Sequence, residues 1–367
     1  MKSIEELIRT GKAAGASDVH IAANVPVKYR IDGQLTNLDP DIISPDDCEN
    51  YAKELSGRNY DKIRDIGEWD GSDTIAGERI RINAFRAAGH VSLALRILAD
   101  HIPELDSLGL PPVVSKFSGW EKGIVLVTGE TGSGKSTTLA AILNQINHSR
   151  REHIITLEDP IEYVYQPDLC LINQREIGTD TESYANGLRA ILREDPDVIL
   201  IGEMRDTETM ETAMTAAETG HLVFATLHTN SAVDSVDRIV GSFPADKQPQ
   251  IRMQLSTTLK AVLSQQLLVR KGGKGRVCAC EAMIVNQAIK NQIREGNTPQ
   301  MQSSLLSSAD IGSLTMDNCL ISQVRQNLID PETAIAAAFD PDFVERNVGH
   351  PVTSHVMPQT SVKRRFI

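Results

Sequence analysis

The stretch Gly129-Glu130-Thr131-Gly132-Ser133-Gly134-Lys135-Ser136-Thr137 decides the fold of this chain. It matches the pattern G-x-x-x-x-G-K-[S/T] in full. An apolar run at 123–128 precedes it, and helix-forming residues at 138–145 follow it. A glycine-rich turn between a buried strand and a helix is typical of a loop that wraps backbone N–H groups around phosphate oxygens. The stretch therefore predicts an α/β fold with a phosphate-binding loop (P-loop) at the end of a strand.

The residue types of this P-loop predict how it holds ATP. Lys135 is expected to reach the β- and γ-phosphates, and the Ser136 hydroxyl to ligate Mg²⁺. The residues expected to contact the nucleotide are Gly129, Thr131, Gly132, Ser133, Gly134, Lys135, Ser136 and Thr137. The alternative is a chance glycine-rich turn, and the flanking strand and helix argue against it.

Two further apolar runs end in acidic residues. Residues 198–202 lead to Glu203, and residues 153–157 lead to Glu158. Ligands of open parallel sheets bind at the carboxyl ends of the strands. Both carboxylates are therefore expected to face the γ-phosphate, where they hold Mg²⁺, directly or through water, or activate the attacking water. An exposed charge that ends a strand is the alternative for Glu203, and the complete P-loop makes it the weaker one.

Two acidic residues that follow Glu158 have two possible interpretations. Asp159 and Glu162 fit the site, but they also fit the start of a helix, because Pro160 suits a first helical turn. A fourth apolar run, at 221–226, leads to His228. We expect His228 to hydrogen-bond the γ-phosphate or the nearby acid and so to sense the nucleotide, while His221, at the other end of the run, has a structural role.

Upstream of the P-loop, apolar and polar residues alternate. This period of two is typical of half-buried strands, and Asp32-Gly33 is a suitable hairpin turn between two of them. The expected elements are an amphipathic helix at 3–14 and strands at 18–21, 27–31, 79–83 and 91–98. Residues 1–100 are therefore expected to form a small domain that mixes helices with antiparallel strands.

Chain-breaking residues and apolar runs predict the other boundaries. Gly and Pro at 101–112 predict a linker. Short apolar strands alternating with helices predict a second domain at 113–348, with a mainly parallel sheet and helices on both faces. From residue 246 onward the chain is expected to be helical, on the spacing of Leu255, Leu259, Val262 and Leu263. Residues 349–367 are expected to form a disordered tail.

Composition limits the classes of function. The formal net charge of -12 argues against a protein that coats nucleic acid. No apolar run approaches the roughly 18 residues that span a bilayer, and no signal peptide is recognised, so we expect a cytoplasmic protein. The five cysteines are scattered, which suits a reducing compartment. Cys278-Ala279-Cys280 lacks a second ligand pair for zinc and is expected to be part of a strand.

The order of these motifs resembles the secretion ATPase superfamily of type II secretion and type IV pili. Within it, the chain is most similar to the retraction ATPases of twitching motility. The resemblance covers residue 1 to about residue 345. It rests on Thr156-Leu157-Glu158-Asp159-Pro160-Ile161-Glu162-Tyr163, on residues 192–206, on Thr226-Leu227-His228-Thr229-Asn230, and on residues 16–21 and 29–33 in the first domain.

The resemblance implies a PAS-like N-terminal domain, a RecA-like P-loop domain and C-terminal helices. It implies a homohexameric ring that hydrolyses ATP with Mg²⁺ to power retraction of the type IV pilus. ATP is then expected between the two domains, with Arg81 and Arg96 completing its site. The resemblance gives Glu158 and Glu203 the Mg²⁺ and water-activating roles and gives His228 the nucleotide-sensing role. The implied partner is an inner-membrane platform protein, through which alone the ring would contact the membrane.

Three features favour retraction over assembly. We expect no large extra N-terminal domain, and the paired CxxC insert common in assembly and secretion members is absent from the sequence. Residues 288–296 resemble the retraction motif near the C-terminus, with Lys290 and Gln292 where Arg and Leu are usual.

Three alternatives stay open at this stage. The chain could be a related motor for pilus assembly or for type II or type IV secretion. It could be a nucleotide sensor without turnover, against which Lys135, Ser136 and Glu203 argue. It could be a nucleic-acid translocase, against which the acidic balance and the lack of interleaved aromatic and basic residues argue.

Overall fold

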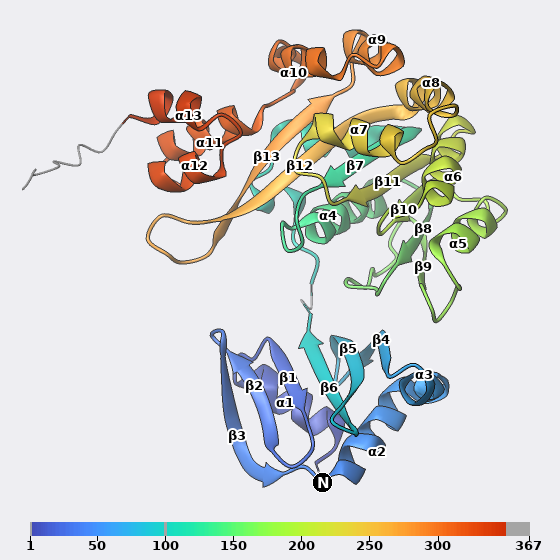
Figure 1. Cartoon of the computed structure of the whole chain (residues 1–367), viewed down its shortest axis with the longest axis vertical. Helices are drawn as coiled ribbons and strands as arrows, with labels where there is room; N and C mark the ends of the chain where they lie inside the picture. Colours follow the sequence, from blue (N-terminus) through green and yellow to red (C-terminus); the bar gives the residue numbers. More distant parts are fainter. Residues whose placement is uncertain (1, 99–100, 350–367) are drawn as a thin grey trace, which may run out of the picture.

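The chain forms two domains, and each has its own sheet and its own apolar core (Figure 1). The computed structural model describes residues 2–98 and 101–349. Two domains, an N-terminal sheet domain and a P-loop domain with a mainly parallel sheet and C-terminal helices, are the architecture that the sequence predicts. The predicted α/β fold class is confirmed.

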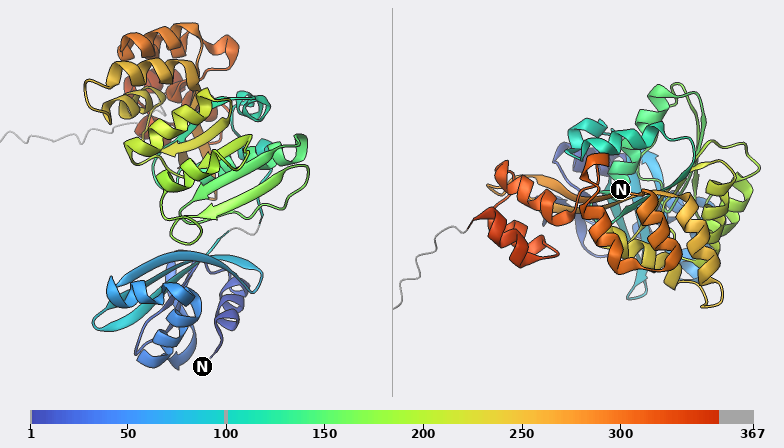
Figure 2. Two further views of the ribbon diagram at one scale, coloured as in Figure 1. Left: turned by 90° about the vertical axis from the view of Figure 1, so that its right-hand side faces the viewer. Right: turned by 90° about the horizontal axis from the view of Figure 1, so that it is seen from above.

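The N-terminal domain is a six-stranded antiparallel sheet covered by three helices on one face (Figure 2). The sheet order is β3-β2-β1-β6-β5-β4. The strands are β1 (Asp18–Ile21), β2 (Pro26–Ile31), β3 (Gln34–Ile42), β4 (Glu68–Ile75), β5 (Glu78–Ala87) and β6 (His90–Ile97), and the helices are α1 (Ile4–Ala13), α2 (Pro45–Ser56) and α3 (Tyr60–Asp65). The predicted turn joins β2 to β3, and Asp32 and Gly33 both have positive φ angles, as a tight hairpin turn requires.

The second domain has a seven-stranded sheet in the order β13-β12-β7-β11-β10-β8-β9. All neighbouring strands are parallel except β12 and β13, which are antiparallel. The strands are β7 (Gly123–Thr128), β8 (His153–Glu158), β9 (Leu171–Glu176), β10 (Val198–Ile201), β11 (Leu222–Leu227), β12 (Leu259–Val269) and β13 (Arg276–Ile284). Because helices cover both faces, the central strands are apolar throughout rather than alternating.

Two helical layers enclose this sheet. On one face α4 packs with α11, α12 and α13, and on the other face α5 to α10 pack together. The helices are α4 (Lys135–Ser149), α5 (Tyr184–Ile191), α6 (Thr207–Glu218), α7 (Ala232–Gly241), α8 (Gln248–Thr258), α9 (Gln287–Glu295), α10 (Thr298–Leu306), α11 (Met316–Arg325), α12 (Pro331–Ala337) and α13 (Pro341–Val348). Strand β7 shows the division, since Val125 and Val127 join one core and Ile124 and Leu126 the other.

A segment of this domain that was predicted to be helical is a strand. A helix was expected through Leu259, Val262 and Leu263, but α8 ends at Thr258 and Leu259 begins the long strand β12. The residues of β12 are buried on both faces, so apolar residues do not alternate along it. Because polar residues such as Ser264 and Gln265 are also buried in β12, its apolar residues show no period that separates a buried strand from a helix.

The remaining segments fit the two cores. In the region predicted as a linker, Leu105–Leu108 forms a short 3₁₀ helix, and Leu105 is buried in the core of the second domain. Cys278 and Cys280 lie on β13, as the strand interpretation expected. No helix among residues 2–98 and 101–349 is long and apolar enough to cross a membrane. Apart from Gly349, the predicted tail lies outside the described residues.

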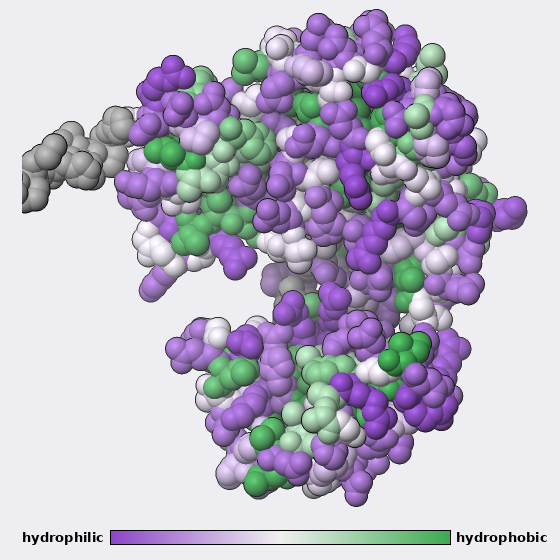
Figure 3. All heavy atoms as spheres, in the orientation of Figure 1, coloured by the Kyte–Doolittle hydropathy of each residue, from purple (hydrophilic) through white to green (hydrophobic). Residues whose placement is uncertain are grey.

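The two domains touch along one side and separate along the other. Where α3 and β4 approach β9, Arg58 Nη2 donates to the Thr179 carbonyl at 3.0 Å. On the opposite side, near β3 and the β12–β13 hairpin, the surface is hollowed into a deep notch (Figure 3). The domain boundary is therefore partly packed and partly open.

Candidate functional site

Four neighbouring parallel strands end at one cavity of about 540 Å³. The P-loop follows β7, Glu158 is the last residue of β8, and Glu203 and His228 follow β10 and β11. Strands β7, β11, β10 and β8 are adjacent in the sheet, so their carboxyl ends lie side by side. The structure thus brings together the P-loop, both predicted acids and the predicted histidine.

The glycines give the P-loop its shape. Gly129 has a φ of 138°, and a Cβ atom there would lie 2.3 Å from the carbonyl oxygen of Gln265 on β12. Gly134 has a φ of 94° and is the N-cap of α4, whose amino end borders the cavity. Any larger residue at Gly129 would push the loop away from β12, and the free N–H groups at the start of α4 favour an anion.

Lys135 is held inside the loop. Its Nζ donates to the carbonyl oxygens of Gly129 at 2.8 Å and Glu130 at 2.9 Å. Burial lowers the pKa of Lys135, while the charges of Glu203 and Glu162 act in the opposite direction. The ammonium is therefore close to both acids, and an incoming phosphate would take the place of its carbonyl partners.

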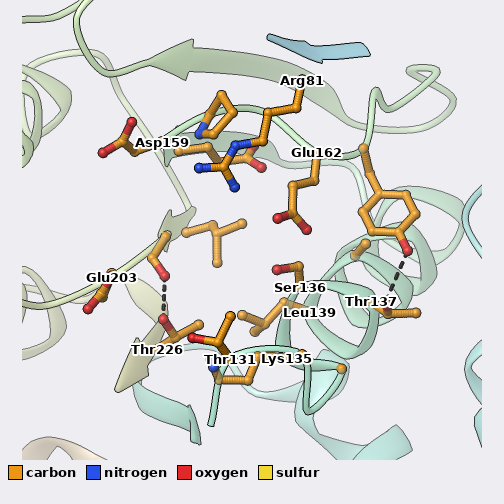
Figure 4. Close-up of a pocket in the computed structure, with 18 of the residues that line it drawn as sticks. Arg81, Thr131, Lys135, Ser136, Thr137, Leu139, Asp159, Glu162, Glu203 and Thr226 are labelled. Atoms are coloured by element: carbon orange, nitrogen blue, oxygen red, sulfur yellow. Dashed lines mark hydrogen bonds between the residues drawn. The ribbon is translucent and has the colours of Figure 1, made fainter. Parts of the chain in front are cut away.

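Glu203 is half-buried and held from two sides. Arg205 Nε donates to Glu203 Oε2 at 2.7 Å, and His228 Nε2 lies 3.3 Å from Glu203 Oε1. The hydrogen bond to Glu203 raises the pKa of Arg205. Thr226, the residue two before His228, donates its hydroxyl to the Gly202 carbonyl (Figure 4). Adjacent strands β10 and β11 therefore fix the acid and the histidine as a pair.

Glu158 has a different environment from Glu203. Its Oε1 accepts hydrogen bonds from Thr156 Oγ1 at 2.6 Å and Gln174 Nε2 at 3.1 Å. Burial nevertheless raises the pKa of Glu158. A carboxylate whose pKa is raised by burial is a better proton acceptor than a solvated one.

Residues 159–170 contain no helix, so the helix-start interpretation of Asp159 and Glu162 is wrong. The segment is a loop that lies over the cavity. The hydroxyl of Tyr163 is 2.9 Å from Thr137 Oγ1 on α4, which ties the loop to the P-loop helix. Figure 4 shows Glu162 pointing into the cavity toward Ser136.

The N-terminal domain contributes two arginines to the same cavity. Arg81 on β5 and Arg96 on β6 are register partners in the antiparallel pair, and both line the cavity. Arg96 Nε donates to Asp18 Oδ1 on β1 at 2.9 Å. Figure 4 shows Arg81 reaching into the cavity from the side opposite Lys135 and Thr131. These cations lie where they can meet a bound polyphosphate.

A second cavity, of about 610 Å³, adjoins the P-loop on its other side. Gly134, Thr137 and Leu267 line both cavities, so the two meet at the start of α4. Its walls include Ser133 Oγ, Gln265 Oε1 and Gln323 Oε1, which are buried atoms without a hydrogen-bond partner. Buried polar atoms are usually paired, so this cavity suits a polar occupant.

A metal ion would need oxygens from its ligand as well as from the chain. Within the described ranges, no group of three or more His, Cys, Asp or Glu side chains is arranged to hold a metal ion alone. Mg²⁺ commonly binds through one or two protein oxygens together with substrate phosphates. The Ser136 hydroxyl and the carboxylates of Glu158 and Glu203 border the cavity and fit that requirement.

Comparison with known proteins decides the family. The model of the "Type II/IV secretion system protein" family matches residues 74–304. The chain belongs to this family. It is 42% identical over 341 residues to the type IV pilus retraction ATPase PilT of Pseudomonas aeruginosa, covering 92% of this chain and 99% of that protein. It is 44% identical over 335 residues to the twitching motility protein of Neisseria gonorrhoeae, covering 90% and 89%.

Solved structures of the secretion system family have the same architecture. The crystal structure of the pilus retraction motor PilT with bound ADP matches with a TM-score of 0.88 and 46% identity, over 94% of this chain and 100% of that one. The ATPase DotB of Legionella pneumophila matches with a TM-score of 0.81 and 26% identity, over 90% and 93%. The resemblance to retraction ATPases that the motifs indicated is confirmed.

Most of the predicted site residues of this family member line the first cavity. They are Thr131, Gly132, Gly134, Lys135, Ser136, Thr137, Glu158, Glu203, His228, Arg81 and Arg96. Gly129, the first residue of the loop, packs against Gln265 on β12, and Ser133 lines the second cavity. The predicted structural role of His221 agrees with its Nδ1, which is 2.8 Å from the Ala216 carbonyl.

Sequence reasoning missed several lining residues, among them Arg205, Tyr165 and Tyr184. Arg205 lies within the motif at 192–206, and only the geometry shows its contact with Glu203. Tyr165 and Tyr184 also line the cavity, and burial raises the pKa of both phenols. A tyrosine in a loop or at the start of a helix has no distinguishing pattern in the sequence, so no signal pointed to them.

Proposed function

We propose that this chain is an ATPase motor subunit that powers retraction of a type IV pilus. The observation that carries the proposal is the convergence of the P-loop, Glu158, Glu203 and His228 at one sheet edge, facing arginines from the other domain. The relatives named as retraction ATPase and twitching motility protein supply the process. We further propose that the subunits form a homohexamer at the cytoplasmic face of the inner membrane, where a platform protein of the pilus machine holds the ring.

The two cavities suggest how ATP would lie. The acids and arginines surround the first cavity, so the γ-phosphate belongs there. The α-phosphate end then faces Gly134 and Thr137, from which the second cavity opens. The nucleoside would enter this second cavity and give partners to the unpaired amide oxygens of Gln265 and Gln323.

The chain's own residues divide the chemistry between them. Lys135 would leave the carbonyls of Gly129 and Glu130 and neutralise charge on the β- and γ-phosphates. Glu158, with its raised pKa, would accept the proton of the attacking water. Glu203, held by Arg205 and His228, would orient the water ligands of Mg²⁺. When bound, Mg²⁺ would supply charge neutralisation between the phosphates.

The test combines purified protein with cells. The purified chain should hydrolyse ATP only with Mg²⁺, and deletion of its gene should leave the host with more surface pili and no twitching. A host without pili after deletion would instead identify an assembly motor. A host with normal pili and normal twitching would refute a role in the pilus machine, and the absence of Mg²⁺-dependent ATP hydrolysis would refute the ATPase assignment.

A further inference from the structure

A buried carboxylate at the domain boundary receives donors from both domains. Glu176, the last residue of β9, is only 5% exposed. It accepts a hydrogen bond from the Ile161 N–H at 3.1 Å within its own domain. From the N-terminal domain, Ser72 Oγ on β4 and Arg79 Nη2 on β5 also donate to it, the latter at 3.3 Å. Glu176 is therefore one of the points at which the two domains are joined.

Arg79 completes this junction at the same residue, Ile161. Its Nε donates to the Ile161 carbonyl at 3.2 Å, while its Nη2 contacts Glu176 and Ser72. Arg79 and Glu176 thus bind both polar backbone groups of Ile161. Ile161 lies between Pro160 and Glu162, which line the nucleotide cavity. The fork of a guanidinium suits this double contact, and a lysine could make only part of it.

Strand β5 links the junction to the cavity. Arg79 and Arg81 are separated by the buried Ile80, so both point to the same side of β5. Arg79 is bound to the loop that carries Glu162, and Arg81 reaches the cavity that Glu162 lines. Two residues along a strand span roughly 7 Å, so a shift of β5 against this loop moves Arg81 relative to any bound phosphate.

We propose that Arg79 and Glu176 are a positioning pair that sets Arg81 against the γ-phosphate of bound ATP. This inference rests on the proposed function, in which Arg81 contacts the phosphate. The pair is not needed to fold either domain, because each domain has a separate core. Its loss should free the N-terminal domain to shift, and a displacement of about 1 Å at a reacting group can lower a rate by roughly 100-fold.

The experiment is a double-mutant cycle on the full-length chain, with steady-state ATP turnover and ADP affinity as readouts. Arg79→Ala should lower kcat by roughly 10- to 100-fold with little change in ADP affinity, because the lost contact serves the transition state. In an Arg81→Ala background, Arg79→Ala should cause no further loss. Arg79→Lys should recover part of the activity. Glu176→Gln, which keeps its acceptor oxygen but loses its charge, should follow the same non-additive pattern.

Arg58→Ala is the matched control, because exposed Arg58 also crosses the domain boundary but donates to the Thr179 carbonyl and not to Ile161 or to the carboxylate of Glu176. It should retain kcat within about twofold. The proposal is overturned if Arg79→Ala behaves like Arg58→Ala. It is also overturned if Arg79→Ala lowers kcat by the same factor in the wild-type and in the Arg81→Ala background. It is also overturned if Arg79→Ala and Glu176→Gln lose activity only in proportion to a lowered melting temperature. None of these outcomes contradicts the proposed ATPase function, which is tested separately. That function stands if the wild type hydrolyses ATP and Lys135→Ala abolishes the hydrolysis.

Discussion

The short helix α9, within the segment that resembles a retraction motif, can be probed at two adjacent positions. Ile293 is 1% exposed and Ile289 is fully buried, and both pack in the core of the P-loop domain beside α8. Arg294, the next residue, is exposed. We therefore compare Ile293→Asp with Arg294→Asp, which place the same new side chain on the buried and the exposed face of one helix.

The expected magnitudes differ widely. Burial of one isoleucine side chain stabilises a protein by about 2–3 kcal/mol, and the substitution of Ile293 removes this contribution. A carboxylate in its place adds a desolvation cost of at least ~2 kcal/mol, because the residues that surround Ile293 in this core are apolar. Ile293→Asp should therefore destabilise the domain by about 4 kcal/mol or more. Arg294→Asp exchanges a cation for an anion near the carboxyl end of α9 and should cost less than about 1 kcal/mol.

Chemical denaturation followed by circular dichroism measures the loss of stability, and twitching and pilus counts in the host measure the effect on retraction. We expect Ile293→Asp to lose fold and turnover together. We expect Arg294→Asp to keep fold and turnover but to stop twitching, because the exposed face is what α9 can offer to a neighbour. If Ile293→Asp unfolds at the same denaturant concentration as the wild type, the packing of α9 in this core is refuted. Normal twitching in Arg294→Asp would show that the exposed face of α9 has no part in retraction.

Four further outcomes are expected. Lys135→Ala should abolish ATP hydrolysis in a phosphate-release assay, because no other cation takes its place in the loop; wild-type turnover would contradict the P-loop assignment. Glu203→Gln should bind ATP in isothermal titration but scarcely turn it over, and loss of binding would instead indicate a structural role. Burial raises the pKa of Glu158 above its value in the unfolded chain, so ionisation of this carboxyl opposes folding at pH values above the unfolded pKa and not below it. Glu158→Gln should therefore raise the melting temperature at about pH 8 and leave it unchanged at about pH 4, and it should lower turnover. Light scattering should find a hexamer whose turnover falls with Arg81→Ala or Arg96→Ala, and a stable, fully active monomer would contradict the hexamer.

The α9 comparison also changes how that segment should be tested. The amphipathic spacing of Ile289 and Ile293 predicts a helix, and the structure contains it, capped by Asn286 and ended by Gly296 in the left-handed region. Spacing alone leaves open whether the apolar face meets the same chain or a partner. Because both isoleucines are buried within this chain, replacing them tests folding, and only the outer face tests coupling.

Sequence patterns located the site well where one strand directly precedes one functional residue. The P-loop, Glu158, Glu203 and His228 each follow an apolar run, and parallel strands bring such ends to a common edge. The pattern failed at β12, where burial on both faces removes the period of two. It also failed for Tyr165 and Tyr184, because their contribution depends on how loops fold over the cavity and not on neighbours in the sequence.

Contacts between domains lie furthest from what sequence patterns can predict. Arg79, Arg81 and Arg96 are similar cations on the adjacent strands β5 and β6, and nothing in the sequence distinguishes their partners. In the structure Arg96 pairs with Asp18 within its own domain, Arg79 pairs with Glu176 across the boundary, and Arg81 reaches the cavity. These assignments depend on the relative placement of two separately folded bodies, which local periodicity does not encode.

That same separation explains how a hydrolysis site can drive movement. A ligand shifts a conformational equilibrium only by binding one arrangement better than another. Here the two domains have independent cores but share one cavity, so the cost of changing their relation falls on boundary contacts such as the one between Arg79 and Glu176 and not on the cores. A γ-phosphate held by Lys135 on one side and Arg81 on the other would favour an arrangement in which the two domains are close together around the cavity. Release of the phosphate would remove that preference. Under the proposed function, the chemistry and the mechanical step would both act through Arg81, so a change that uncouples them should be sought in the boundary contacts rather than in the P-loop.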